Sequence, residues 1–275
     1  MPGFLDRFKR PPVVAVLRLD GVISSGGMLG RQGLNLAALA GPIQQAFALK
    51  RLAAVALAIN SPGGSPVQSS LIAGRIRQMA DEKKVPVIAF AEDVAASGGY
   101  WLATAADEIY ADAASIVGSI GVISAGFGFT GLIDRLGVER RLHTSGDRKS
   151  FLDPFRPEQP EDVERLKQIQ RELHETFRQQ VVARRGARLK ADHATLFSGE
   201  FWTGPRAVEL GLVDGIGQLR PVMRERFGEK VRLRPVGARR SWLARRLGME
   251  SLAAEAAGAV LAAAEERALW SRYGL

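Results

Sequence analysis

Short apolar runs alternate with segments of helical spacing along the first part of the chain. Residues 13–19, 53–59 and 85–91 are almost continuously apolar, which is typical of strands buried on both faces of a sheet. Residues 34–49 and 67–79 carry apolar side chains at helical spacing. This alternation of helix with buried strand predicts an α/β fold with parallel strand pairing.

The second half of the chain continues with shorter strands and one long helix. Residues 109–110 and 116–123 have the apolar composition of short strands. Pro160 opens a long predicted helix, because proline is tolerated in a first helical turn, and an apolar stripe continues from there to Gly186. His174 lies beside that stripe among charged residues, which indicates a solvated surface histidine.

Composition divides the chain into three parts. Residues 1–12 are a short basic tail, residues 13–236 carry the strand and helix signals, and residues 237–275 are first basic and then rich in alanine. The last part predicts a helical extension, with arginines around Trp242. Two interpretations of it stay open: a helix that packs on the domain or on another subunit, and a helix that attaches to a membrane surface.

The overall composition fits a globular protein, with 46% hydrophobic and 24% charged residues among 275. The absence of cysteine excludes thiolate chemistry and disulfides, and three histidines argue against a multi-histidine metal site. A net charge of +9 without an interleaved basic and aromatic motif predicts an Arg-rich surface and no nucleic-acid binding. Because no apolar run reaches about 18 residues and no signal peptide is recognisable, we expect a cytoplasmic protein with at most peripheral membrane contact.

Ser97 occupies the turn between the third apolar run and a buried helix that begins near Tyr100. A serine at a helix start is most often only a cap. A cap does not require the Gly98-Gly99 pair that follows, whereas paired glycines let another backbone or a substrate approach closely. Because backbone N–H groups at a helix start attract negative charge, this serine is also a candidate nucleophile whose oxyanion the next amide would hold.

A nucleophilic serine needs a base, and the chain offers two candidates. His143 follows an extended segment, but nothing else in the sequence supports it. Lys149 lies in a loop beside the apolar pairs 151–152 and 154–155. A lysine is a base only when neutral, and burial disfavours its charged form. Taken alone, Lys149 would more often be a surface lysine, but Ser–Lys dyads are a known alternative to Ser–His–Asp triads.

Several short segments together resemble the S49 peptidase family, the signal peptide peptidase A and SohB-like serine peptidases. These segments are the turn at 60–64 (Asn-Ser-Pro-Gly-Gly), the Ser97 turn at 95–100, the Gly-Ser-Ile-Gly-Val stretch at 118–122, the Lys149 loop at 146–155, and a glycine-bounded stretch at 199–217. Each is a weak signal alone, but their order and spacing together are specific to that family. Residues 13–236 would then form the peptidase domain.

The resemblance implies a role for three catalytic side chains. Ser97 would be the nucleophile and Lys149 the general base. Ser119 would hydrogen-bond the lysine amine and orient it. No metal and no cofactor would be needed.

The resemblance also implies roles for the glycines near Ser97. The oxyanion hole would be formed by the backbone N–H of Gly98 and by that of a second glycine, for which we favour Gly63 over Gly64. Gly64 and Gly99 would contact the substrate.

The fold implied is an α/β spiral of strand–strand–helix units, as in Clp-type peptidases and crotonases, with a C-terminal helical extension. Chains would assemble into a ring-shaped homo-oligomer with active sites shared between subunits. Substrates would be small or unfolded peptides, signal-peptide remnants among them. Two alternatives stay open: an enoyl-CoA hydratase-like enzyme that binds a CoA thioester on the same fold, and a non-catalytic or capsid-assembly relative.

Overall fold

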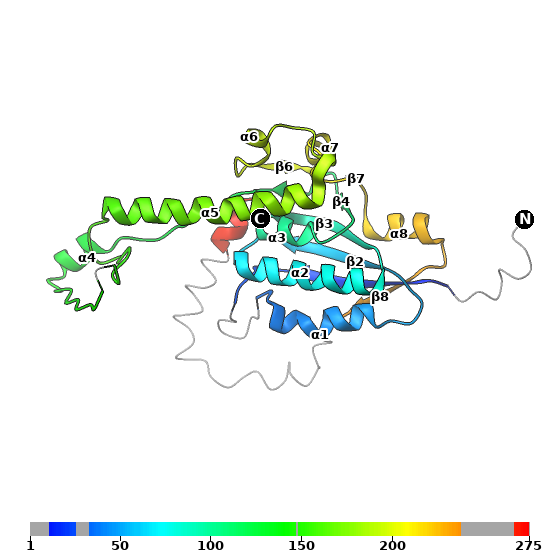
Figure 1. The fold of residues 1–275 in the computed structure, drawn as a ribbon, viewed down its shortest axis with the longest axis horizontal. Helices are drawn as coiled ribbons and strands as arrows, with labels where there is room; N and C mark the ends of the chain where they lie inside the picture. Colours follow the sequence, from blue (N-terminus) through cyan, green and yellow to red (C-terminus); the bar gives the residue numbers. More distant parts are fainter. Residues whose placement is uncertain (1–10, 26–32, 147, 238–266, 275) are drawn as a thin grey trace, which may run out of the picture.

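The computed structural model describes residues 11–25, 33–146, 148–237 and 267–274. Most of the basic N-terminal tail and most of the C-terminal extension lie outside these residues, so their predicted structure is not tested. Within the described part of the chain, eight strands form one sheet with helices packed on its faces (Figure 1).

The sheet is almost entirely parallel. Its strand order is β6-β5-β3-β2-β1-β8, while β4 pairs with β3 and with β7. The only antiparallel pair among the described strands joins β5 to β6. The strands are β1 (Val13–Asp20), β2 (Leu52–Ser61), β3 (Val87–Ala96), β4 (Glu108–Ala111), β5 (Ile116–Gly118), β6 (Phe201–Thr203), β7 (Gly215–Ile216) and β8 (Arg232–Val236).

The three apolar runs form the adjacent central strands β1, β2 and β3, which confirms the predicted α/β fold. β3 is longer than predicted and ends at Ala96, directly before Ser97. One edge of β3 pairs first with β4, through residues 88–91, and then with β5, through residues 94–96. The strand that leads into Ser97 therefore pairs with both of the strands that follow it in the chain, β4 and β5.

The prediction of a strand over residues 116–123 is wrong beyond Gly118. Gly118 and Ser119 both have positive φ values, 111° and 52°. The Ser119 N–H donates to the carbonyl of Glu200 at 2.6 Å. The backbone therefore leaves the ladder at this point, and residues 119–122 continue as an irregular segment beside α3 and α5.

Helices cover both faces of the sheet. One face carries α1, α2, α3 and part of α5 over the larger apolar core, and α8 covers the other face over a smaller core around Phe90 and Met223. The helices are α1 (Leu36–Phe47), α2 (Pro66–Lys83), α3 (Gly98–Ala103), α4 (Thr130–Arg135), α5 (Pro160–Arg185), α6 (His193–Leu196), α7 (Gly204–Glu209) and α8 (Leu219–Phe227).

The long helix α5 projects beyond the sheet (Figure 1). Phe177 and Val181 near its C-terminal end are buried, while Leu166 and Ile169 of the same apolar stripe are only half-buried. Residues 123–146 and 148–159, which include α4, lie at the projecting end and are called the arm below. Part of the apolar stripe on α5 is therefore left uncovered by this chain.

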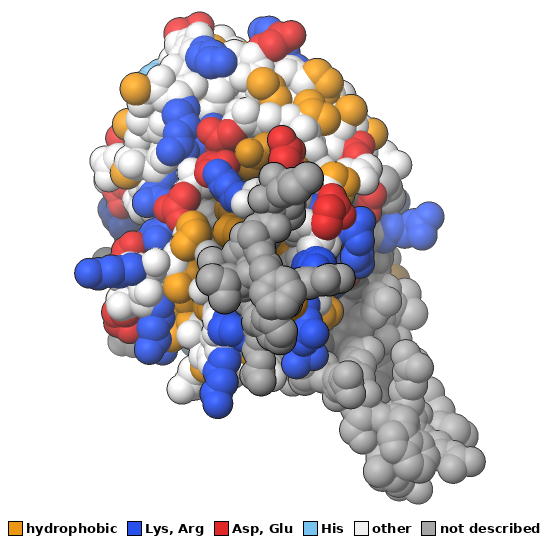
Figure 2. All heavy atoms as spheres, turned by 90° about the vertical axis from the view of Figure 1, so that its right-hand side faces the viewer, with side chains coloured by type: hydrophobic (Ala, Val, Ile, Leu, Met, Phe, Trp, Pro, Cys, Tyr) orange, Lys and Arg blue, Asp and Glu red, His pale blue; other side chains and the backbone are white. Residues whose placement is uncertain are grey.

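The side of the molecule opposite the arm carries mixed charge. Figure 2 shows Lys and Arg side chains there interspersed with Asp, Glu and apolar side chains. On α8, Arg226 pairs with Glu108, and Arg224 lies 3.7 Å from Glu229. Two arginines of α8 therefore have a carboxylate close by.

A buried ion pair ties the end of α5 to the rest of the fold. Arg185, whose side chain is 2% exposed, pairs through Nη1 with Oδ2 of Asp214 at 2.7 Å. Its Nη2 donates to the carbonyl of Gly211 at 2.9 Å. Asp214 in turn accepts the backbone N–H of Ile109 on β4 at 2.7 Å. The pair thus joins α5 to a central strand.

We predict that Arg185→Met lowers the free energy of unfolding by about 3–5 kcal/mol, because it leaves the Asp214 carboxylate without its buried partner. The matched control is Arg206→Met. Arg206 pairs with Glu209 on the surface, with side chains 54% and 63% exposed, and its loss should cost at most about 1 kcal/mol. Denaturant unfolding monitored by circular dichroism measures both. Equal losses in the two variants would contradict a special role for the buried pair.

Candidate active site

Ser97 lies on a strained turn between β3 and α3. Its backbone has φ 52° and ψ −123°, and a positive φ is uncommon and costly for a residue other than glycine. The Ser97 N–H donates to the carbonyl of Gly118 at 2.8 Å, and the Ser97 carbonyl accepts from the N–H of Trp101 at 3.0 Å. Its side chain makes no capping hydrogen bond to α3. The interpretation of this hydroxyl as a helix cap is therefore wrong.

The glycine pair after Ser97 allows α3 to begin against two other elements. A Cβ atom on Gly98 would collide with the Ser69 hydroxyl on α2, and one on Gly99 would collide with the carbonyl of Ser61 on β2. The N–H of Gly98 is in the first turn of α3, where helical N–H groups have no partner within the helix. Gly99 is buried against β2, so the structure does not place it at a substrate-accessible surface.

The two glycines after Pro62 differ in their surroundings. Gly63 (φ 102°) is buried, and an added Cβ would lie 2.7 Å from Cβ of Ser97. Its N–H donates to Oγ of Ser61 at 3.3 Å. Gly64 is exposed, and its bridge to Ile23 uses the Gly63 carbonyl and the Ser65 N–H. The Gly64 N–H takes no part in that bridge.

A small pocket opens beside Ser97. It is formed by Gly64, Pro66, Ser97, Gly98, Trp101, Gly121, Val122, Leu173 and Phe177. The rings of Trp101 on α3 and Phe177 on α5 stack at 4.8 Å between centroids, with 20° between their planes. Apart from Ser97, the lining residues are apolar or glycine.

The segment 118–122 contributes Gly121 and Val122 to one wall of this pocket. Ser119 is half-buried and directly follows the Gly118 carbonyl that holds Ser97. Gly121 passes close to Gly199, whose Cα would lie 3.1 Å from an added Cβ. Ser119 therefore follows directly on the residue that accepts the Ser97 N–H, and its role in orienting the lysine stays a prediction.

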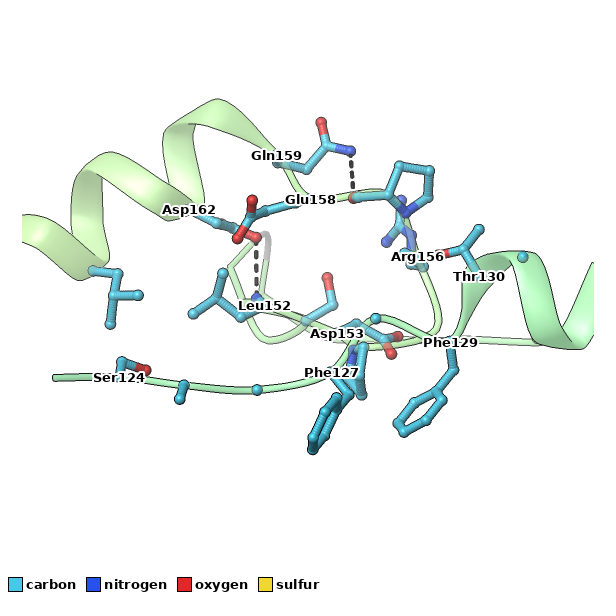
Figure 3. A pocket seen from close by; sticks show the side chains of 18 residues that line it. Ser124, Phe127, Phe129, Thr130, Leu152, Asp153, Arg156, Glu158, Gln159 and Asp162 are labelled. Carbon is cyan, nitrogen blue, oxygen red and sulfur yellow. Dashed lines mark hydrogen bonds between the residues drawn. The ribbon is translucent and has the colours of Figure 1, made fainter. Parts of the chain in front are cut away.

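Lys149 is described by the structure but is not among the residues that line the pocket beside Ser97. Lys149 is exposed and lies in the arm, where its N–H donates to the carbonyl of Gly146 at 3.2 Å. The same loop is anchored to the first turn of α5, because Asp162 accepts the N–H of Leu152 at 3.1 Å (Figure 3). Along the α5 axis, Asp162 lies about 17 Å from Leu173, which lines the Ser97 pocket. Within one chain, Lys149 and Ser97 are therefore too far apart for a direct hydrogen bond between their side chains.

The other polar side chains of the region have structural surroundings. The Tyr100 hydroxyl donates to the carbonyl of Leu212 at 2.7 Å, and its burial raises the pKa of this hydroxyl, which therefore stays protonated. His143 is exposed in the arm. His174 is half-buried, and its Nε2 lies 3.2 Å from the carbonyl of Ile120. The interpretation of His174 as a solvated surface residue is therefore wrong.

The sequence interpretation missed the α5 wall of the pocket. Leu173 and Phe177 belong to a stripe whose helical spacing predicts burial but does not identify the neighbour. Among the described residues, no group of acidic or histidine side chains is arranged to hold a metal ion. No described helix combines the length and hydrophobicity that crossing a membrane requires.

Comparison with known proteins identifies relatives of this chain. The sequence model of peptidase family S49 matches residues 79–230. The "Na(+)/H(+) antiporter NhaA" of Brucella abortus is 51% identical over 291 residues, which cover 100% of this chain and 39% of that protein. The "Serine protease SPPA, chloroplastic" of Arabidopsis thaliana is 33% identical over 210 residues, which cover 75% of this chain and 31% of that protein.

A solved structure, a mutant of the 1510-N membrane-bound stomatin-specific protease, aligns with a TM-score of 0.47 at 14% identity, covering 83% of this chain and 99% of that one. The chain spans less than half the length of the two sequence relatives, so their names describe larger proteins. The family match covers more than half of the present chain. On this match, the chain belongs to peptidase family S49.

Proposed function

We propose that this chain is a serine endopeptidase with Ser97 as its nucleophile. The observation that carries the proposal is the uncapped Ser97 hydroxyl, held on a strained strand-to-helix turn beside an apolar pocket. The same strand-to-turn-to-helix arrangement exposes the nucleophile of α/β-hydrolases. A protein that only needed a turn here would not require this backbone strain. The S49 family match and the serine protease relative from Arabidopsis support the proposal.

In the proposed mechanism, Oγ of Ser97 attacks the carbonyl carbon of the scissile peptide bond. The amine of Lys149, oriented by Ser119, takes the serine proton and later passes it to the leaving amine. This yields an acyl-enzyme, which a water molecule then hydrolyses with the same lysine as base. Lysine serves in this way in Ser–Lys dyads.

The oxyanion would be held by two backbone N–H groups. Gly98 supplies one from the first turn of α3. For the second we propose Gly64 rather than Gly63, because the Gly63 N–H already donates to Oγ of Ser61. Gly64 is exposed and lines the same pocket as Ser97.

The pocket supports a preference for small or apolar side chains next to the scissile bond. Trp101, Leu173 and Phe177 give it an apolar lining, and the pocket is narrow. A peptide must be extended to lie between Gly64 and the segment 118–122. Small or unfolded peptides, including signal-peptide remnants, meet this requirement better than folded proteins.

Lys149 would come from a neighbouring copy of the chain. The distance between its loop and Ser97 along α5 makes a dyad within one chain hard to form. The arm that carries Lys149 also exposes large apolar side chains: Ile123, Phe127, Phe129, Leu132, Leu136, Val138, Phe151 and Phe155. Such a concentration on a projecting element is typical of a surface that another protein covers.

The aromatic part of the arm is preorganised for such a contact. Phe129 lies 6.4 Å from Phe127 and 5.6 Å from Phe155 between ring centroids. Phe127 is 82% exposed, and Figure 3 shows the rings of Phe127 and Phe129 pointing away from Gln159 and Asp162. Repeated head-to-tail contacts of this kind close into a ring if the rotation permits. A ring-shaped homo-oligomer with shared sites is therefore part of the proposal.

The two alternative functions, a CoA-thioester enzyme and a non-catalytic relative, do not explain the strained conformation of Ser97. An enoyl-CoA hydratase-like enzyme would need the two amides but no strained serine. A non-catalytic assembly or capsid-processing relative would use the arm without Ser97. Covalent labelling of Ser97 by a fluorophosphonate separates the peptidase from both. Peripheral membrane contact through the C-terminal extension concerns residues outside the described part and stays a proposal.

We predict that Ser97→Ala and Lys149→Ala each reduce peptide hydrolysis by roughly 10⁴-fold or more, because both residues act in one proton-transfer unit. The controls Ser70→Ala and Lys230→Ala change exposed residues outside the site and should leave the rate unchanged. Hydrolysis of a fluorogenic peptide measures all four. A Lys149→Ala enzyme that keeps more than about a tenth of the rate would remove Lys149 as the base.

We predict that the rate of hydrolysis rises from neutral to mildly alkaline pH. The proposed base takes the serine proton only as a neutral amine, which low pH disfavours for any amine base. Lys149→Arg should be inactive throughout the pH range, because guanidinium does not deprotonate in proteins. A pH–rate profile with its only ascending limb near roughly pH 4–5 would indicate a carboxylate base instead.

We predict that two inactive variants complement each other. Ser97→Ala retains the lysine and Lys149→Ala retains the serine. When they are unfolded together and reassembled in equal amounts, about a quarter of the interfaces in a random ring pair an intact Ser97 with an intact Lys149. Activity should then return. An inactive mixture that is shown to co-assemble would rule out the shared site but not the peptidase.

A further inference from the structure

The segment 119–122, which contributes Gly121 and Val122 to the wall of the Ser97 pocket, has little support from the sheet. The ladder ends at Gly118. Beyond it, two hydrogen bonds hold this wall within the described part of the chain. The Ser119 N–H donates to the carbonyl of Glu200, and the Ile120 carbonyl meets Nε2 of His174 at 3.2 Å. The second bond comes from a side chain on α5.

The chemistry of this contact defines the state of the histidine. A backbone carbonyl can only accept a hydrogen bond, so Nε2 of His174 must carry the proton. Ile120 itself is fully buried. Its side chain therefore keeps the segment attached to the core, while the hydrogen bond fixes the direction of its backbone.

His174 also occupies a defined place relative to the Ser97 pocket. Its neighbour Leu173 lines that pocket, as does Phe177 one turn further along α5. His174 lines a second hollow of about 220 Å³ with Val122, Lys167, Gln170 and Arg171. Val122 borders both hollows. His174 thus stands where the pocket wall meets α5.

We propose that His174 is a positioning residue that holds the segment 119–122 against α5, so that the segment presents a fixed backbone edge to an extended peptide. The inference rests on the proposed peptidase function. An extended peptide beside Ser97 passes along this segment, because Gly121 and Val122 line the pocket. A segment that shifts without its hydrogen bond binds the peptide less well, while Ser97 keeps its own support from Gly118.

The test compares His174→Ala with His174→Gln, because the Gln side-chain amide donates from a position close to Nε2 of histidine. His174→Ala should raise KM for a peptide substrate roughly tenfold, about the effect of one lost hydrogen bond. Its kcat should fall less than about threefold, and His174→Gln should recover most of the loss. His193→Ala, which changes an exposed histidine on α6, should match the unchanged protein. Equal kinetics for all four proteins, or a fall in kcat alone, would overturn the inference.

A measurement independent of activity separates this inference from the proposed function. Amide hydrogen exchange in a peptide covering residues 118–123 should be faster in His174→Ala and slow again in His174→Gln, with exchange in β2 and β3 unchanged. If exchange in the segment stays the same in His174→Ala, His174 does not hold it and the inference fails. If exchange changes as expected but the unmodified protein neither hydrolyses peptides nor reacts with a fluorophosphonate at Ser97, the proposed function fails while the anchoring role stands.

Discussion

The candidate site depends on one close contact between two backbones. The turn after β2 lies directly against the turn after β3, so that Gly63 touches Ser97 and Gly98. A Cβ atom at Gly63 would lie 2.7 Å from the Ser97 Cβ and clash with it, and the positive φ of Gly63 is one that glycine adopts readily. Because the two turns are in contact, the N–H groups that follow them can point to one place beside the serine hydroxyl.

The fold supports that contact from several directions. β3 continues to the residue before Ser97 and pairs with β2 on one edge and with β5 on the other. The Gly118 carbonyl at the end of β5 then receives the Ser97 N–H. On the opposite side, the stacking of Trp101 with Phe177 fixes α3 against α5. The strained conformation of Ser97 is thus maintained by bonds that do not involve its hydroxyl, which leaves the hydroxyl available for chemistry.

Helix α5 connects the site to the part of the molecule that a single chain leaves open. Its C-terminal end is anchored through the buried Arg185–Asp214 pair, its middle lines the Ser97 pocket, and its first turn holds the Lys149 loop. One continuous helix therefore connects the arm to the residues that line the pocket. An arm with exposed aromatic side chains is costly for an isolated chain in water, and association of copies would bury it.

The sequence by itself determined the central strands and the α/β class, because a continuous apolar run specifies a strand buried on both faces. It also predicted the turn at Ser97 from the glycine pair that follows it. It also indicated the family, since the order of short motifs is preserved in the sequence. Only the tertiary structure showed that the Gly63 N–H donates to Oγ of Ser61, because this hydrogen bond depends on how the turn after β2 folds. It likewise decided that the strand predicted after Gly118 stops there and that His174 bonds to that segment. The separation of Lys149 from Ser97 is also tertiary, because it follows from the direction in which a packed helix carries the arm away from the sheet.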